Sequence, residues 1–164
     1  MSTGSDGAGQ SGPTMCLSRA GLGIGSTAKE LSIAAPNGAG VDFAIDGYAY
    51  HLPDDASTAS IPAALPIQAA DTTCLYLVSV DADLAVSVTK GTEIPNAELT
   101  VDSVIGRSVL HWPEPVDGKC PIGAVKVKTV AVTFTAGTTD FDASGITDTY
   151  YSFLGGMPLA PLTS

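Results

Sequence analysis

The sequence predicts an all-β fold: an antiparallel β-sandwich or barrel-like domain with short helical turns. Three observations support this fold class. β-Branched residues are concentrated in the stretch Lys119–Phe153, an Asp-Gly pair at residues 46–47 separates two β-favouring runs, and 18 glycines and 11 prolines interrupt the 164 residues. We expect a flexible N-terminal arm over residues 1–15, a single β-rich domain over residues 16–153 and an extended C-terminal tail over residues 154–164. One domain is expected because a chain of this length buries about two thirds of its unfolded surface in one core.

The composition limits the classes of partner. Hydrophobic residues make up 45% of the chain and charged residues only 15%, against about 25% in typical globular proteins. This low charge fits a surface covered by small residues or one covered by another subunit, since interface cores are depleted in charged residues. The net charge of −10, with seven Lys and Arg, argues against binding to nucleic acid or to an anionic membrane.

The N-terminal segment Met1–Thr14 is rich in Gly and Ser and has almost no bulky side chains. It cannot bury enough apolar surface to offset the entropy of ordering, so we expect it to be disordered alone. It is either a free tail or an arm that becomes ordered along a neighbouring subunit. It lacks the basic start and apolar core of a signal peptide, and no run approaches the roughly 18 apolar residues of a membrane span, so we expect synthesis in the cytoplasm.

Two hairpins are predicted in the first half of the domain, after a short strand at Lys29–Ala34. Residues 41–45 and 48–52 flank Asp46-Gly47, the sequence of a two-residue type I′ turn in which both central residues need a positive φ. The residues expected to share a face are Val41, Phe43 and Ile45 in the first arm and Tyr48, Tyr50 and Leu52 in the second. After an irregular crossing with one helical turn at Pro53–Ala70, residues 72–80 and 84–90 form the second hairpin around Asp81-Ala82-Asp83. These carboxylates are too few for a calcium loop, and we expect them to accept hydrogen bonds from nearby backbone amides.

The second half of the domain is predicted to hold the longest strand. Short strands are possible at Leu99–Val104 and Arg107–Trp112, and a long strand is expected at Ile122–Thr135, with a bulge near Thr129-Val130. Within it Val125 and Val127 point inward and Lys126 and Lys128 outward, as lysines do when they protect an edge strand. Residues 137–146 form one helical turn or a loop, and Thr147–Phe153 returns as a strand.

Residues with reactive side chains do not form a recognisable motif. The three cysteines, Cys16, Cys74 and Cys120, are odd in number and lack CxxC spacing, which argues against a zinc site or a disulfide framework, although one pair could bridge. Cys74 lies in an apolar run and is expected to be buried as a small hydrophobe. His51 and His111, which precedes Trp112, have unrelated spacing and are expected to be structural. The glycines of residues 21–25 lack the context of a nucleotide-binding loop, and no GxSxG occurs. We therefore expect no catalytic, cofactor-binding or metal-binding residues and no enzyme.

Four segments between Val41 and Phe153 together resemble a known family. They are IDGYAYHLPDD, AADTTCLYLVSVDADLAVSVTKGTE, PVDGKCPIGAVKVKT and FTAGTTDFDASGITDTYYSF. In this order they resemble the head decoration, or capsid cement, proteins of tailed bacteriophages, which are small β-rich virion proteins.

The resemblance implies a structural virion protein on the outer face of the capsid. It would act as a homotrimer that binds the major capsid protein and stabilises contacts between its subunits, with no nucleic-acid or membrane partner. We expect the N-terminal arm and the crossing Pro53–Ala70 to lie at the capsid and the central strands to form the trimer. The alternative is a head-fibre or tail-associated carbohydrate-binding module, in which aromatic side chains would stack on sugars.

Overall fold

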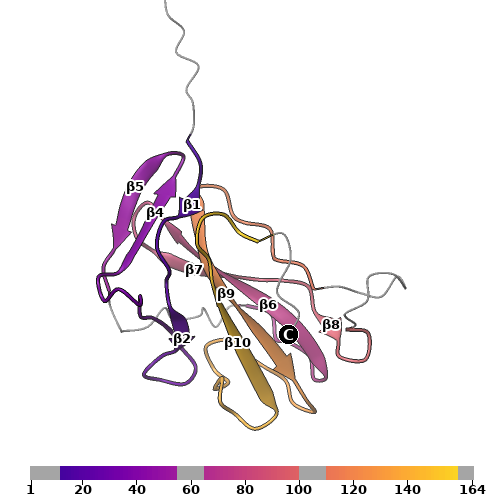
Figure 1. Cartoon of the computed structure of the whole chain (residues 1–164). Helices are drawn as coiled ribbons and strands as arrows, with labels where there is room; N and C mark the ends of the chain where they lie inside the picture. The colour runs from indigo at the N-terminus through magenta and orange to yellow at the C-terminus, as the bar shows by residue number, and fades with distance from the viewer. Residues whose placement is uncertain (1–11, 55–64, 100–109, 159–164) are drawn as a thin grey trace, which may run out of the picture.

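The computed structural model describes residues 12–54, 65–99 and 110–158 (Figure 1). Within these ranges the chain forms β-strands and no helix, and every strand pair is antiparallel, which confirms the predicted all-β class. Consequently, none of the described residues belongs to a helix that could cross a membrane. The strands are β1 (Met15–Cys16), β2 (Leu22–Ile24), β3 (Leu31–Ile33), β4 (Val41–Ile45), β5 (Tyr48–Leu52), β6 (Thr72–Asp81), β7 (Val86–Lys90), β8 (Ile94–Pro95), β9 (Lys119–Thr129) and β10 (Ile146–Ser152).

The strands form three sheets, and none of them closes into a barrel in the described part of the chain. The main sheet has the order β10-β9-β6-β7, with β8 pairing beside β7 on β6. A three-stranded sheet has the order β1-β4-β5, and β2 pairs with β3 alone. The long strands β6, β9 and β10 run side by side through the centre of the molecule (Figure 1).

The main sheet is covered on both faces, which explains why Thr72–Val80 of β6 is buried at every position. On one face alternate β6 residues such as Tyr76 belong to a cluster that includes the small sheets. On the other face Leu75 and Leu77 pack in two smaller clusters with Leu110 and Phe153. Representative members of the large cluster are Cys16, Leu31, Phe43, Val125, Val127 and Phe134.

The first predicted hairpin is confirmed residue for residue. β4 and β5 pair from Val41 with Leu52 to Ile45 with Tyr48, and Asp46 and Gly47 have φ of 51° and 82°. Val41, Phe43 and Ile45 are buried on one face, and the Phe43 ring stacks on that of Tyr50 with centroids 5.5 Å apart. The predicted strand at Lys29–Ala34 is also found, as β3.

Residues 12–15, which the sequence assigned to the flexible arm, are part of the fold. Gly12 N donates to Asp46 O (3.1 Å), Gly47 N donates to Pro13 O (3.2 Å), and Asp46 N donates to Thr14 Oγ1 (3.1 Å). A Cβ on Gly12 would lie 2.4 Å from Gly47 Cα, so the two backbones cross too closely for a side chain. The predicted boundary is too late in the chain, because composition cannot reveal contacts made by backbone atoms. Residues 1–11 lie outside the described part.

The second hairpin is confirmed with a slightly wider turn. β6 pairs with β7 from Tyr76 with Lys90 to Val80 with Val86. The Asp81 carboxylate accepts hydrogen bonds from the backbone N of Asp83 (3.1 Å) and Ala85 (2.9 Å), as expected. Residues 84 and 85, predicted as strand, belong to the turn, where Leu84 has a φ of 65°.

The predicted long strand differs from β9 at both ends. β9 begins at Lys119 and ends at Thr129, because Ala131 has a φ of 56° and reverses the chain. The bulge lies at Ile122, not near Thr129-Val130: Val78 faces Gly123 while Ser79 faces Pro121. This extra residue lets Cys120 and Val125, an odd number of residues apart, face the same core.

The other expectations about this half are confirmed only in part. Val125 and Val127 are fully buried as predicted, but Lys126 and Lys128 do not mark an edge, because β9 lies between β6 and β10. Of the two forms predicted for residues 137–146, a helical turn or a loop, the structure has the loop, a series of turns without helix, and β10 confirms the closing strand. Of the strands predicted between residues 99 and 112, residues 100–109 lie outside the described part, and Leu110–Trp112 form no strand. The start of the predicted tail is joined to the fold by a bridge between Gly155 and Cys16, and residues 159–164 are not described.

Candidate interaction surface at the β10 edge

The clearest unpartnered element is the outer edge of β10. Within the described ranges β10 pairs with β9 alone, in a continuous register over all seven residues. Its sequence, ITDTYYS, contains no lysine, no proline and no bulge. Natural edge strands are usually blunted by such features, because open backbone groups attract another strand. In the described part of the chain, β10 is therefore an edge strand that lacks these three protections.

The register shows which backbone groups of β10 point outward. Val130 N donates to Gly145 O (2.8 Å) and Phe153 N donates to Ile122 O (3.1 Å), so the odd-numbered residues of this segment direct their backbone groups toward β9. In an antiparallel ladder the intervening residues direct theirs the other way. The N–H and C=O groups of Asp148, Tyr150 and Ser152 therefore face away from β9.

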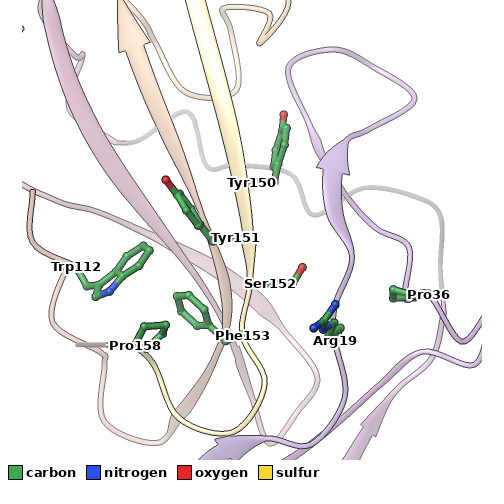
Figure 2. A pocket seen from close by; sticks show the side chains of 8 residues that line it. All are labelled: Arg19, Pro36, Trp112, Tyr150, Tyr151, Ser152, Phe153 and Pro158. Carbon is green, nitrogen blue, oxygen red and sulfur yellow. The ribbon is translucent and has the colours of Figure 1, made fainter. Parts of the chain in front are cut away.

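A pocket of about 410 Å³ opens beside this edge (Figure 2). Its lining residues are Arg19, Pro36, Trp112, Tyr150, Tyr151, Ser152, Phe153 and Pro158. Figure 2 shows Trp112, Phe153 and Pro158 on one side of β10 and Arg19 and Pro36 on the other. We refer to it as the β10 edge pocket. It offers an extended segment a backbone edge between two sets of side chains.

The connection to β2 fixes one side of the β10 edge pocket. The backbone N of Leu22 donates to Ser152 Oγ at 3.4 Å. A Cβ on Gly123 would lie 2.5 Å from Leu22 Cδ1, so the glycine at this position lets β2 pack closely over β9. Arg19 and Pro36, which precede β2 and follow β3, are held beside the C-terminal end of β10 in this way.

An aromatic cluster forms the other side. The Trp112 ring meets that of Tyr151 at 5.4 Å and 84° and that of Phe153 at 5.2 Å and 81°, both edge-to-face arrangements. Trp112 Nε1 and the Tyr151 hydroxyl are buried and have no hydrogen-bond partner among the described residues. The sequence analysis did not predict this cluster, because some 40 residues separate Trp112 from Tyr151 and Phe153. The aromatic residues of the closing strand were the one signal that could have indicated it.

Exposed apolar residues continue this surface. The antiparallel bridge between Cys16 and Gly155 places Leu17 beside Leu154, and their side chains are 49% and 58% exposed. Arg19 and Phe153 line the β10 edge pocket and are close in sequence to Leu17 and Leu154, so these two leucines adjoin the pocket. Apolar residues that gather on a surface mark sites of association more often than single exposed ones do.

The residues that the sequence singled out for reactive chemistry do not come together. His51 Nδ1 and Asp42 Oδ1 lie 2.8 Å apart on the exposed face of the first hairpin. His111 is exposed in the connection that precedes β9. The three cysteines are buried and free, and burial raises the pKa of Cys74 to about 11 and of Cys120 to about 12. Such thiols are poor nucleophiles at neutral pH. No group of three His, Cys, Asp or Glu side chains suited to a metal occurs in the described residues.

Comparisons of the chain with protein-family models, with curated proteins and with solved structures find no match.

Proposed function

We propose that this chain is a structural virion protein, a capsid decoration or cement protein that binds the outer surface of a phage head. As a homotrimer it would contact the major capsid protein and stabilise the junctions between its subunits, without a cofactor or catalytic residues. We also propose that its sheets pack as a β-sandwich, which would provide the rigid body that such a role needs.

The observation that carries the proposal is the edge of β10 that no strand of the described residues pairs with, next to exposed Leu17 and Leu154. An open edge strand beside apolar side chains is a liability in an isolated protein, because it pairs with other chains. A protein that works within an assembly retains such a surface for its partner. The low charge of the chain, 15%, supports the same conclusion.

The four segments that resemble decoration proteins support the proposal in a second way. They supply β5 with the turn that precedes it, the second hairpin β6–β7 and the pair β9–β10, and so include four of the five strands of the main sheet and one strand of the three-stranded sheet. The resemblance therefore covers one connected structural unit and not scattered loops.

The N-terminal segment supplies a way to divide the proposed contacts. Gly12–Thr14 are fixed to the tip of the first hairpin, so the chain enters the fold at that tip (Figure 1). Removal of residues 1–11 leaves these hydrogen bonds intact, whereas removal of residues 1–14 also removes the Thr14 hydroxyl that binds Asp46 N. The shorter deletion is thus the clean test of an arm that binds the capsid.

The experiment combines light scattering with shell binding. The purified protein is expected to have the mass of three chains and to bind saturably to empty, undecorated shells assembled from the major capsid protein encoded in the same genome. The deletion of residues 1–11 is expected to keep the trimer mass and to weaken shell binding. A monomer that ignores the shells would contradict the proposal, and unchanged binding by the truncated protein would remove the arm from it.

One observation favours the alternative of a carbohydrate-binding module. The Trp112–Tyr151–Phe153 cluster in the β10 edge pocket gathers aromatic side chains that the sequence alone did not reveal, with Trp112 and Tyr151 partly buried and Phe153 buried. A screen of the intact protein against host surface polysaccharides separates the two functions. Saturable polysaccharide binding that Trp112→Ala abolishes, in a protein that ignores shells, would favour this alternative.

A further inference from the structure

We propose that two copies of this chain pair edge to edge through β10, antiparallel, with a two-fold axis at Tyr150. The proposal names the partner at the β10 edge pocket and rests on the proposed function only in that the chain works by assembly. It starts from the backbone groups of Asp148, Tyr150 and Ser152, which face outward and are spaced evenly about Tyr150. A second β10 in the opposite direction presents the same three sets of groups.

The register follows from the position of the charges. With Tyr150 on the axis, Asp148 of each copy lies opposite Ser152 of the other copy, and facing side chains are about 5 Å apart at Cβ. Arg19 and Ser152 line the same pocket, so Asp148 of one copy arrives next to Arg19 of the other. The contact occurs twice because the arrangement is two-fold. A register centred on Asp148 would instead place two carboxylates opposite each other, which is unfavourable.

Neither charge has an ion-pair partner among the described residues of one chain. Arg19 and Asp148 take part in none of the ion pairs of the described residues, which join His51 with Asp42, Lys90 with Glu93 and Lys119 with Asp81. Asp148 and Ser152 lie four residues apart on β10, which is about 13 Å along an extended strand. Pairing of two copies therefore brings together charges that β10 keeps apart in one copy.

The shape of the edge suits the same arrangement. The side chains that border the β10 edge pocket, Arg19 and Pro36 on one face and Trp112 and Pro158 on the other, gather at the Ser152 end of β10 (Figure 2). Since the strands run antiparallel, the Asp148 end of the second copy enters between them. The crowded end of each copy thus meets the open end of the other.

This contact differs from the one that would hold a trimer. A two-fold contact joins a residue set to itself and cannot relate three chains in a ring. It would therefore link one trimer to the next. Three-fold and two-fold contacts in one protein generate a network, and such a network is suited to cover a shell made of repeated subunits.

The test measures self-association by sedimentation and light scattering over a range of concentrations. We expect the wild-type mass to rise above that of three chains as concentration increases. Arg19→Asp and Asp148→Arg each place like charges opposite each other and are expected to weaken this step on the order of tenfold. The double variant, Arg19→Asp with Asp148→Arg, restores opposite charges and is expected to restore association. Asp83→Arg, an exposed change in the β6–β7 turn, is the charge-matched control and should associate like the wild type.

The outcomes separate this inference from the proposed function. A mass that stays at three chains at every concentration, with intact shell binding, overturns the two-fold contact and leaves the decoration role. Single variants that associate normally, or a folded double variant that does not recover, also overturn it. Charge-swap rescue in a protein that ignores shells supports the two-fold contact and contradicts the decoration role. Far-ultraviolet circular dichroism of each variant shows that the fold is retained.

Discussion

The buried side chain of Gln68 provides the sharpest test of how the core is held together. Gln68 is fully buried, and its Nε2 donates to Val127 O (3.1 Å), Thr72 O (3.2 Å) and Thr72 Oγ1 (3.3 Å). Its Oε1 accepts from the hydroxyl of Tyr76 at 3.1 Å. Tyr76 is also fully buried, and burial raises the pKa of its hydroxyl far above the ordinary value, so the hydroxyl stays a donor. One amide thus ties the segment before β6 to both β6 and β9.

The cost of Gln68→Met follows from the groups left behind. Methionine has a similar shape, so little of the loss comes from a cavity. The Tyr76 hydroxyl loses its acceptor in the core, which costs about 1–3 kcal/mol, and each lost hydrogen bond adds about 0.5–1.5 kcal/mol. Thr72 O retains a hydrogen bond from Thr129 Oγ1 at 3.1 Å, which limits the damage. With Thr72 O counted as still bonded, the Tyr76 hydroxyl and the two other lost hydrogen bonds together give a destabilisation of about 2–6 kcal/mol, a large share of the 5–15 kcal/mol typical of a domain.

The assay is equilibrium unfolding in urea, applied to a double-mutant cycle. With a typical slope of 1–3 kcal/mol per molar urea, about 3 kcal/mol lowers the midpoint by roughly 1–3 M. Tyr76→Phe removes the donor, so the double variant lacks the unpaired hydroxyl and is expected to recover about 1–2 kcal/mol relative to the sum of the single changes. Strict additivity, or a Gln68→Met protein as stable as the wild type, would refute the role assigned to this amide.

Three more predictions use the same measurement. Gly47→Ala is expected to lower the free energy of unfolding by about 1–3 kcal/mol, more than Gly38→Ala does. Both glycines have a positive φ, but only at Gly47 would an added Cβ meet the N-terminal segment, 2.8 Å from Gly12 Cα. Equal costs for the two variants would contradict this close crossing of the two backbones. Val125→Asp is expected to prevent folding, since it buries an unpaired charge, and a cooperative Val125→Asp protein would show that the faces of β9 are assigned backwards. Burial raises the pKa of Cys74 to about 11 and of Cys120 to about 12 from an ordinary 9.0. The folded state therefore keeps protons that the unfolded state releases, and the free energy of unfolding falls as pH rises above about 9. Cys120→Ala should flatten this decline, and an unchanged pH profile would refute the reasoning.

The hairpins could be predicted from the sequence because their determinants are local. Asp46-Gly47 defines its turn through two positive φ values, and Asp81 defines the other through bonds to amides within four residues. The alternation of Val125 and Val127 likewise needs only the two-residue period of a strand. In these places the interactions that determine the structure lie within a few residues of the sequence signal.

The extent and position of β9 depended on partners that a local pattern does not identify. Lys126 and Lys128 suggested an edge, but two neighbouring strands pair with β9 across some 20 to 50 residues of sequence. Lysine stems can cover apolar surface on a central strand while their amino groups reach water, so outward lysines do not define an edge. The same limit applies to Gln68, whose polar side chain in a proline-bearing crossing gave no sign of its position in the core.

The position of β9 changes the meaning of the low charge. If lysines of β9 do not protect an edge, then β10 has only Asp148 along seven residues to oppose pairing with another strand. The net charge of −10 supplies a general repulsion between copies, but at physiological salt it is screened beyond about 8 Å. General repulsion therefore slows indiscriminate pairing and does not forbid a close contact with matched charges. Arg19, which lines the β10 edge pocket, and Asp148, which lies outside the pocket near the start of β10, meet that condition in one antiparallel register, which makes specific pairing of β10 compatible with an acidic chain.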